Sequence, residues 1–281
     1  MMLSDHIEKG RARLAKSPHI SDPDFAIRQM ALGALHCQAK DLYLRWDRPL
    51  SDTEQRDLGD LVDSRLAGIP LQYLTKYAAF YESEFSVGPG VFIPRKETEL
   101  LVDRLLAEPG ENLRVAELGA GSGNIGISVL RKKPGWEWHA FEVSPEAHLF
   151  ARCNQLQLAA HSHYHLHFGN YLDAVRPLGS FDFSVANPPY LTSEDLSALS
   201  PEVLHEPSEA LWGGQDGLDV IRNFISVSYQ VLKPGGRILL EFGYRQAPAV
   251  RTVLLNNGFE SVEIIRDLAG LDRAATAQRP V

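Results

Sequence analysis

Residues 113–126 read Leu-Arg-Val-Ala-Glu-Leu-Gly-Ala-Gly-Ser-Gly-Asn-Ile-Gly, and this stretch decides the fold. Its first part, Leu113 to Leu118, is a largely apolar run that predicts a buried strand. The glycine turn Gly119 to Gly123 follows and leads into a predicted helix from Ile125 to Arg131. A strand, a glycine turn and a helix in this order let the backbone come close to a ligand. The stretch therefore predicts an α/β domain with a binding site at the turn.

An acidic residue after the next strand supports a ribose-containing ligand. The predicted strand from Trp138 to Phe141 ends at Glu142, roughly twenty residues after the turn, where an acid can bind both ribose hydroxyls. Gly121, Gly123 and Gly126 also match the G-x-G-x-x-G spacing of nicotinamide and flavin enzymes, so the class of cofactor stays open at this point. The alternative without a ligand is that these glycines only permit tight packing of strand against helix.

Further runs complete a mostly parallel sheet. We predict an edge strand with alternating histidines, and then strands at Phe181 to Ala186, Arg237 to Phe242, Ser261 to Arg266 and Ala274 to Arg279. In an open parallel sheet, ligands bind outside the carboxyl ends of the strands, near the point where the strand order reverses. The glycine turn, Glu142 and the residue that follows Ala186 should therefore surround one crevice.

Asn187-Pro188-Pro189-Tyr190 follows the strand that ends at Ala186. Two consecutive prolines remove two backbone donors and fix φ, which makes the corner rigid. The side-chain oxygen of Asn187 and the carbonyl of Pro188 are then two acceptors that match the two donors of a planar NH2 group. Tyr190 would supply an aromatic wall. The alternative is an ordinary Pro-Pro turn in which the asparagine caps its own backbone.

The histidines His161, His163, His165 and His167 alternate strictly, so in a strand they share one face. Metal ligands must converge on one point, whereas a row along a single strand spreads apart. We therefore predict a partly solvated edge strand and no metal site. Tyr171, just beyond this strand, either flanks an adenine ring or packs as a core aromatic.

Composition places the protein among folded, cytosolic proteins. The 281 residues carry a formal net charge of -8, which argues against binding of nucleic acid mainly through phosphates. The two cysteines, Cys37 and Cys153, lie far apart, as expected in a reducing compartment. Met1 to Arg13 lacks the apolar core of a signal peptide, and no run approaches membrane-spanning length. We expect a cytoplasmic location and no contact with a membrane.

The pattern changes twice along the chain. Residues 1–76 predict a helical bundle that binds a partner, with a capping box at Ser51 and Glu54. Residues 77–96 alternate aromatic and polar side chains before a Gly-Pro-Gly interruption, which predicts a β-hairpin linker. Residues 97–281 form the predicted catalytic domain.

These motifs together resemble the class I S-adenosylmethionine-dependent methyltransferases with an N-P-P-Y motif. More closely, the chain resembles the release-factor glutamine N5-methyltransferases (the HemK/PrmC family), over nearly its whole length. The segments that carry the resemblance are Pro70 to Leu74, Phe92 to Arg95, Glu117 to Gly123, Asn187 to Tyr190, Glu206-Pro207, Ala210-Leu211, Asp216 to Leu218 and Arg266 to Leu268.

The resemblance implies a Rossmann-like, seven-stranded sheet joined to the helical domain by the hairpin, and it implies roles for particular residues. S-adenosylmethionine would contact Glu117, Gly119, Ala120, Gly121, Ser122, Gly123, Glu142, Tyr171 and Asn187. The substrate glutamine would enter past Phe92 and Arg95 and bind Asn187, Pro188, Pro189 and Tyr190, of which Asn187, Pro188 and Tyr190 would be catalytic. Two residues depart from the family pattern, because Glu117 and Asn170 stand where an aspartate is more usual.

The implied reaction is methyl transfer from S-adenosylmethionine to the side-chain amide nitrogen of the glutamine in the Gly-Gly-Gln motif of a class I peptide chain release factor, leaving S-adenosylhomocysteine. We expect a monomer without stable nucleic-acid binding. Four alternatives remain at this point: an N6-adenine DNA or RNA methyltransferase that flips out its base, a ribosomal-protein glutamine methyltransferase, a catalytically silent binding protein, and a nicotinamide dehydrogenase.

Overall fold

The computed structural model describes residues 1–158 and 163–281, so His161 of the histidine row lies outside the described residues. The chain divides into two units, one of Met1–Tyr77 with Leu199–His205 and the other of Ala78–Ala198 with Glu206–Val281. Residues 199–205, which the sequence predicts to be part of the catalytic domain, belong to the helical unit, where Glu202 forms an ion pair with the buried Arg65.

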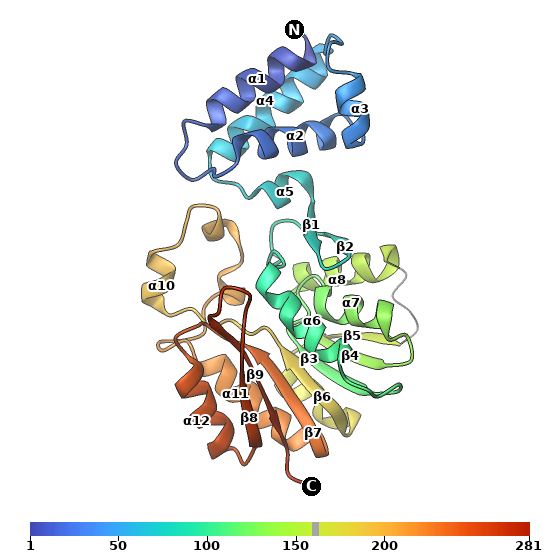
Figure 1. Ribbon diagram of the computed structural model, residues 1–281, viewed down its shortest axis with the longest axis vertical. Coiled ribbons are helices and arrows are strands. Elements are labelled where there is room, and N and C mark those ends of the chain that lie inside the picture. Colours follow the sequence, from blue (N-terminus) through green and yellow to red (C-terminus); the bar gives the residue numbers. More distant parts are fainter. Residues whose placement is uncertain (159–162) are drawn as a thin grey trace. The chain divides into compact units, whose positions relative to one another are not determined.

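The helical unit consists of short amphipathic helices around one apolar core (Figure 1). Its helices are α1 (Leu3–Leu14), α2 (Pro23–Ala34), α3 (Ala39–Leu44), α4 (Asp52–Leu66) and α5 (Leu71–Thr75). Leu3, Ile7, Ile27 and Leu58 are fully buried in that core. The predicted capping box is present at the start of α4, where the Ser51 hydroxyl accepts a hydrogen bond from the Glu54 N–H at 3.2 Å.

The β-hairpin is fastened to the second unit. It consists of β1 (Tyr77–Phe80) and β2 (Ser83–Ser86). The Ser86 N–H donates to the Asn154 side-chain oxygen at 2.7 Å, and the rings of Phe80 and Phe85 pack edge to face in the core of that unit. The hairpin is therefore part of the α/β unit from Ala78 onward rather than a free linker. A 3-10 turn, η1 (Lys96–Thr98), and helix α6 (Glu99–Leu106) follow.

The second unit is built on a seven-stranded sheet in the order β5-β4-β3-β6-β7-β9-β8 (Figure 1). The strands are β3 (Arg114–Leu118), β4 (Glu137–Glu142), β5 (Tyr164–Phe168), β6 (Phe181–Ala186), β7 (Leu232–Glu241), β8 (Glu260–Arg266) and β9 (Asp272–Gln278). The first five pair in parallel, and β9 runs antiparallel to both β7 and β8. This confirms the predicted mostly parallel sheet, although β7 begins five residues earlier than predicted, at Leu232 rather than Arg237.

Helices cover both faces of this sheet, each over its own apolar core. One core contains Leu101, Ile127 and Trp138 and lies under α6, α7 (Asn124–Lys132) and α8 (Pro145–Gln157). The other contains Phe141 and Phe224 and lies under α9 (Tyr171–Ala174), α11 (Asp219–Val231) and α12 (Ala247–Asn256). The remaining short helical segments are α10 (Ser193–Ser197), η2 (Arg176–Leu178), η3 (Val203–His205) and η4 (Ser208–Ala210).

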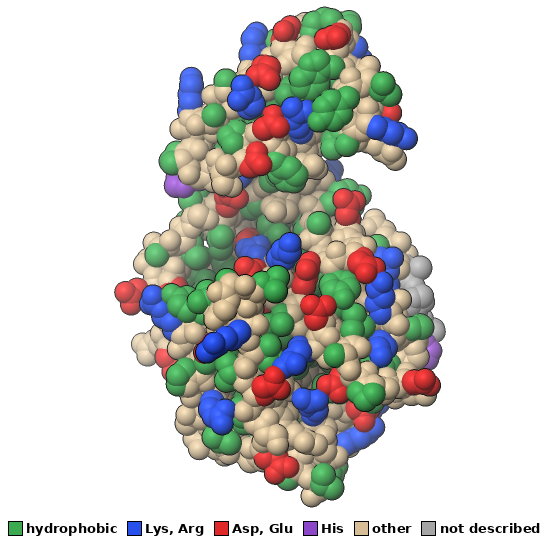
Figure 2. All heavy atoms as spheres, viewed as in Figure 1, with side chains coloured by type: hydrophobic (Ala, Val, Ile, Leu, Met, Phe, Trp, Pro, Cys, Tyr) green, Lys and Arg blue, Asp and Glu red, His purple; other side chains and the backbone are tan. Residues whose placement is uncertain are grey.

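Charged side chains of both signs lie on the surface. Acidic and basic side chains are interspersed over the face drawn in Figure 2, without a continuous basic stripe on that face. None of the helices in residues 1–158 and 163–281 combines the length and apolar composition needed to cross a bilayer.

Candidate active site

A cavity of about 720 Å³ opens within the α/β unit at the carboxyl ends of β3, β4 and β6. This is the place where the strand order reverses, between β3 and β6, as the sequence predicts. Nine of the candidate site residues line it: Phe92, Gly119, Ala120, Gly121, Ser122, Glu142, Asn187, Pro188 and Pro189. The structure thus brings the glycine turn, the acid after β4 and the Asn-Pro-Pro corner to one cavity.

The glycine turn leaves open space on its cavity side. Gly119 and Gly121 have φ of 67° and 54°, which only glycine adopts readily, and a Cβ built on either would meet nothing within 4 Å. Gly126 is different, because a Cβ there would lie 2.4 Å from the Trp138 Nε1. Gly126 is therefore required for the close packing of α7 on β4. This glycine of the G-x-G-x-x-G match serves packing rather than ligand binding.

Glu142 holds the rim of the cavity together. Its carboxylate accepts hydrogen bonds from the backbone N–H groups of Gly121 at 2.8 Å, Val143 at 2.9 Å and Ser144 at 2.8 Å. Burial raises the pKa of this carboxyl, and the three N–H groups oppose that effect. A carboxylate has about four acceptor sites, so roughly one remains for a ligand hydroxyl. Binding of a second ribose hydroxyl requires one of the backbone bonds to open.

The amide of Asn187 is oriented by a chain of hydrogen bonds behind it. Its Nδ2 donates to the Thr98 hydroxyl at 3.0 Å, and that hydroxyl donates to Glu241 at 2.7 Å. Tyr190 donates to the other oxygen of Glu241 at 3.4 Å. Because the single hydroxyl proton of Thr98 goes to the carboxylate, Thr98 can only accept from Asn187. The nitrogen of the Asn187 amide therefore faces Thr98, and its oxygen is left as the acceptor for a ligand.

Glu241 is the buried end of this chain. It is 2% exposed, and burial raises its pKa to about 7. Burial also raises the pKa of Tyr190. Tyr190 does not line the cavity, so its expected role as an aromatic wall is not supported by the structure. Its hydroxyl instead supports the carboxylate that positions Thr98.

Glu206 braces the segment Ile93-Pro94-Arg95 at the mouth of the cavity. One carboxylate oxygen accepts from the Ile93 N–H at 2.9 Å, and the other pairs with the Arg95 guanidinium. Arg95 also stacks over the Phe92 ring, with its Cζ 4.6 Å from the ring centroid. Arg95 itself does not line the cavity, whereas Phe92 does. Arg95 thus packs against a residue that lines the cavity rather than lining it itself.

Comparison with known proteins assigns the chain to a family. Residues 5–75 match the family described as PrmC N-terminal domain, and residues 82–214 match the Methyltransferase small domain. The chain is 35% identical over 263 residues to a release factor glutamine methyltransferase of Prochlorococcus marinus, covering 92% of this chain and 85% of that relative. A relative of the same name from Neisseria gonorrhoeae is 38% identical over 233 residues, covering 83% of this chain and 85% of that relative.

The chain belongs to the release factor glutamine methyltransferase family. Solved structures agree in fold: a methyltransferase from Pyrococcus furiosus superposes with a TM-score of 0.54 at 17% identity, covering 70% of this chain and 89% of that one. A precorrin-6y C5,15-methyltransferase from Geobacter metallireducens gives 0.51 at 16% identity, covering 69% and 94%. These matches confirm the class I methyltransferase fold expected from the sequence.

Two residues expected at the cofactor from the family resemblance lie elsewhere. Glu117 is fully buried and accepts a hydrogen bond from the Trp138 indole at 2.6 Å, and burial raises its pKa to about 8. It does not line the cavity, because alternate residues of a strand point to opposite faces. Tyr171 is 1% exposed, and its hydroxyl bonds Ser184 at 2.8 Å. It is a core aromatic, and its neighbours Asn170 and Leu172 line the cavity instead.

Gly123 also falls outside the cavity lining. Its φ is 80°, and a Cβ there would lie 2.8 Å from Ile127 Cδ1 and 3.0 Å from the Tyr164 hydroxyl. It therefore closes the turn onto α7 from behind.

Sequence reasoning missed Thr98 and Glu241, the two residues that orient Asn187. Glu241 ends the apolar run Ile238 to Leu240, and an acid in that place at a strand end was a usable signal. No local sequence signal points to Thr98, because its hydrogen-bond partners lie 89 and 143 residues away in the chain.

Proposed function

We propose that this protein transfers a methyl group from S-adenosylmethionine to the side-chain amide nitrogen of the glutamine in the Gly-Gly-Gln motif of a class I peptide chain release factor. The observation that carries the proposal is the orientation of Asn187, whose amide oxygen is left free for a donor at the edge of a nucleoside-sized cavity. The family to which the chain belongs supports the same substrate. The reaction takes place in the cytoplasm, where translation terminates.

The residues of the cavity fit the cofactor. Gly119 and Gly121 leave space where a side chain would stand, and Glu142 keeps acceptor capacity for a ribose hydroxyl. Asn170 and Leu172 lie on the same cavity and would contact the base. Asn170 replaces the more usual aspartate; its side-chain oxygen accepts from the Leu172 N–H at 3.0 Å and keeps one lone pair for a ligand. When bound, S-adenosylmethionine supplies a methyl group on a sulfonium centre, which is an electrophile.

The chemical problem is that an amide nitrogen is a poor nucleophile. We propose that Asn187 Oδ1 and the Pro188 carbonyl accept the two N–H groups of the glutamine amide and hold its nitrogen in line. Positioning of this kind can lower a barrier by about 7–11 kcal/mol. The two acceptors also stabilise positive charge as it develops on the nitrogen. The N-methylated amide then releases one N–H proton to water, because an N-protonated amide is a strong acid, and S-adenosylhomocysteine is the leaving group. The Pro-Pro sequence keeps this corner rigid, so the acceptors need not reorganise during the reaction.

Thr98 and Glu241 are positioning residues in this mechanism. Their hydrogen bonds decide which end of the Asn187 amide faces the substrate; Thr98 itself lines the cavity, whereas Glu241 lies behind it. A flipped Asn187 would present two donors to a group that also donates, which abolishes the match.

The test is transfer of labelled methyl from S-adenosylmethionine, with a release factor, a ribosomal protein and duplex DNA offered in parallel. A release factor whose loop glutamine is replaced is the control. Label on the intact release factor, lost with the replacement, supports the proposal. Label on DNA or on the ribosomal protein, but not on the release factor, would overturn it.

A further inference from the structure

The histidine row gains partners from the neighbouring strand. His165 and His167 lie on β5, while His163 stands exposed in the turn before it. The parallel register places His139 of β4 directly beside His165. The ring centroid of His139 lies 4.8 Å from that of His165 and 5.2 Å from that of His167. The convergence that a single strand cannot provide therefore arises between two strands.

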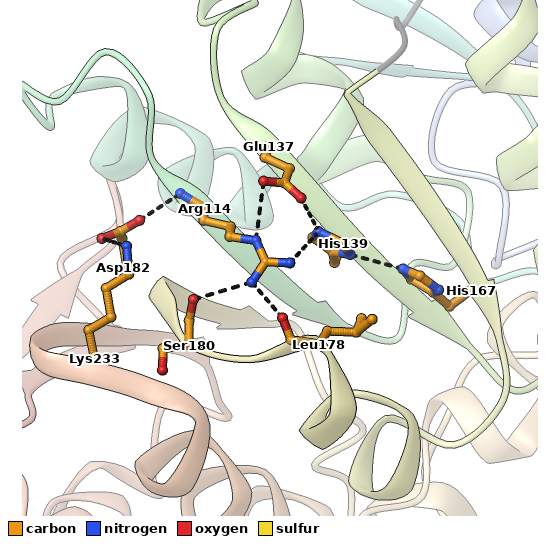
Figure 3. Close-up of polar contacts among 8 residues, drawn as sticks. All are labelled: Arg114, Glu137, His139, His167, Leu178, Ser180, Asp182 and Lys233. Atoms are coloured by element: carbon orange, nitrogen blue, oxygen red, sulfur yellow. Dashed lines mark hydrogen bonds and ion pairs between the residues drawn. The ribbon is translucent and has the colours of Figure 1, made fainter.

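The protonation of His139 follows from its contacts (Figure 3). Its Nε2 lies 2.7 Å from a Glu137 oxygen, and its Nδ1 lies 3.0 Å from the His167 Nε2. Because an ionised carboxylate only accepts, the proton of a neutral His139 sits on Nε2. The lone pair of Nδ1 then accepts a hydrogen bond from the Nε2–H of His167 at 3.0 Å, and an ion that binds Nδ1 replaces that hydrogen bond. A histidine that donates one N–H to a carboxylate and presents its other nitrogen is the usual arrangement of a metal ligand.

Arg114 contacts Glu137, His139 and a backbone carbonyl, and so helps to fix the position of the His139 ring. Its Nε contacts the second oxygen of Glu137 at 3.2 Å, and its Nη1 donates to the Leu178 carbonyl at 2.6 Å. Its Nη2 lies 3.2 Å from His139 Nε2, on the side of the ring away from Nδ1 (Figure 3). Arg114 and Glu137 thus hold the ring of His139 while leaving Nδ1 free of both.

Imidazole nitrogen is the ligand that zinc, copper and nickel ions share, and the Nδ1 of His139 and the Nε2 of His167 already lie 3.0 Å apart.

We propose that His139, His165 and His167 form a binding site for a zinc-like divalent transition-metal ion, with Glu137 orienting His139. Two nitrogens bound to a tetrahedral zinc ion lie about 3.3 Å apart, close to the 3.0 Å between His139 Nδ1 and His167 Nε2, and both rings must also turn so that their lone pairs meet at the ion. A His165 nitrogen lies within 4.8 Å of both a His139 nitrogen and a Glu137 oxygen, whereas His167 lies outside that group, so the proposed site requires the rings of His165 and His167 to turn toward each other. His165 and His167 are half-buried on an edge strand, which leaves access for the ion and for a water as fourth ligand.

The site is structural rather than catalytic. It would tie the edge strand β5 to β4, and His167 stands three residues before Asn170, which lines the cofactor cavity. A bound ion stabilises the folded state because the unfolded chain has no preformed site.

The test is zinc binding to tag-free, chelator-stripped protein, measured by competition with a chromophoric chelator and by thermal unfolding. We expect one zinc ion per chain, a rise in Tm, and no competition from Mg²⁺, which prefers oxygen ligands. His165→Gln and His167→Gln should each lose at least tenfold in affinity, and Glu137→Gln about tenfold, as outer-shell changes do. Circular dichroism checks that each variant folds.

Two matched controls separate this site from other zinc ligands. His163→Gln removes an exposed histidine from the same row, and Cys153→Ser removes the exposed thiol. Both should bind zinc as the unaltered protein does. Absence of zinc binding at micromolar concentration, binding unchanged in His165→Gln and His167→Gln, or binding lost in Cys153→Ser would overturn the proposal.

Discussion

The hydroxyl of Thr98 should affect the rate of methyl transfer through its hydrogen bond to Asn187. Thr98→Val keeps the shape of the side chain and removes the group that accepts from Asn187 and donates to Glu241. A hydrogen bond that involves a charged group contributes about 1.5–3 kcal/mol. If that free energy is lost from the orientation of Asn187, kcat falls roughly 10- to 150-fold. The KM for release factor should change little, because the Thr98 hydroxyl is already engaged by Asn187 and Glu241.

The assay is steady-state methyl transfer to release factor, with Thr98→Ser as the matched control. Serine retains the hydroxyl, so its kcat should stay within about threefold of that of the unaltered protein, since the hydrogen bonds are kept. Thermal unfolding shows whether Thr98→Val is folded at the assay temperature. A folded Thr98→Val protein with an unchanged kcat, or a Thr98→Ser protein as slow as Thr98→Val, would refute the orienting role.

Three further predictions concern the buried acids and the glycine turn. An ionised Glu241 can only accept from Thr98, which keeps Asn187 in the productive orientation. As its pKa is about 7, kcat should rise with pH through about 7, and Glu241→Gln should flatten that limb of the pH–rate profile. The pKa of Glu117 is about 8 in the folded state and 4.5 in the unfolded state. Between these two pH values the folded state therefore binds one more proton than the unfolded state. Stability should therefore fall as pH rises from 4.5 to about 8, by on the order of 3–5 kcal/mol, and Glu117→Gln should remove that slope in denaturant titrations at pH 5 and 8.5. Gly121→Ala should lower the affinity for S-adenosylhomocysteine at least tenfold, measured by calorimetry. The added Cβ would occupy cavity space that the proposal assigns to the ligand. Gly270→Ala, at a similar positive φ with equally open surroundings but in a remote turn, should leave that affinity unchanged; equal losses in both variants would contradict this reading.

The features that could be predicted from sequence are those set by local chemistry. The glycines of residues 119–123 stand at positive φ in the turn that their spacing predicts. The strand Phe181–Ala186 begins and ends where its apolar run does. The capping box at Ser51 also forms as predicted. In each of these cases the signal and the structure lie within a few residues of each other.

The features that could not be predicted depend on contacts across the sheet. The Asn187 amide is oriented by Thr98 and Glu241. These two residues are distant in sequence from Asn187 and from each other. Tyr171 lies beside the site in sequence, yet its ring turns into the core, because Ser184 offers a buried hydroxyl partner. The histidine row converges only through His139, whose place beside His165 follows from strand register rather than from any local motif.

The most direct test of the central claim is single-turnover methyl transfer by Asn187→Ala, with S-adenosylmethionine binding and thermal unfolding measured on the same preparation. The Asn187 oxygen is proposed to hold the substrate amide, and the other residues that line the cavity are unchanged in this variant. We expect the variant to fold and to bind S-adenosylmethionine, and to transfer methyl to the loop glutamine at least a hundredfold more slowly, the scale of losing one transition-state contact. Transfer at the unaltered rate by a folded, cofactor-bound Asn187→Ala protein would contradict the account.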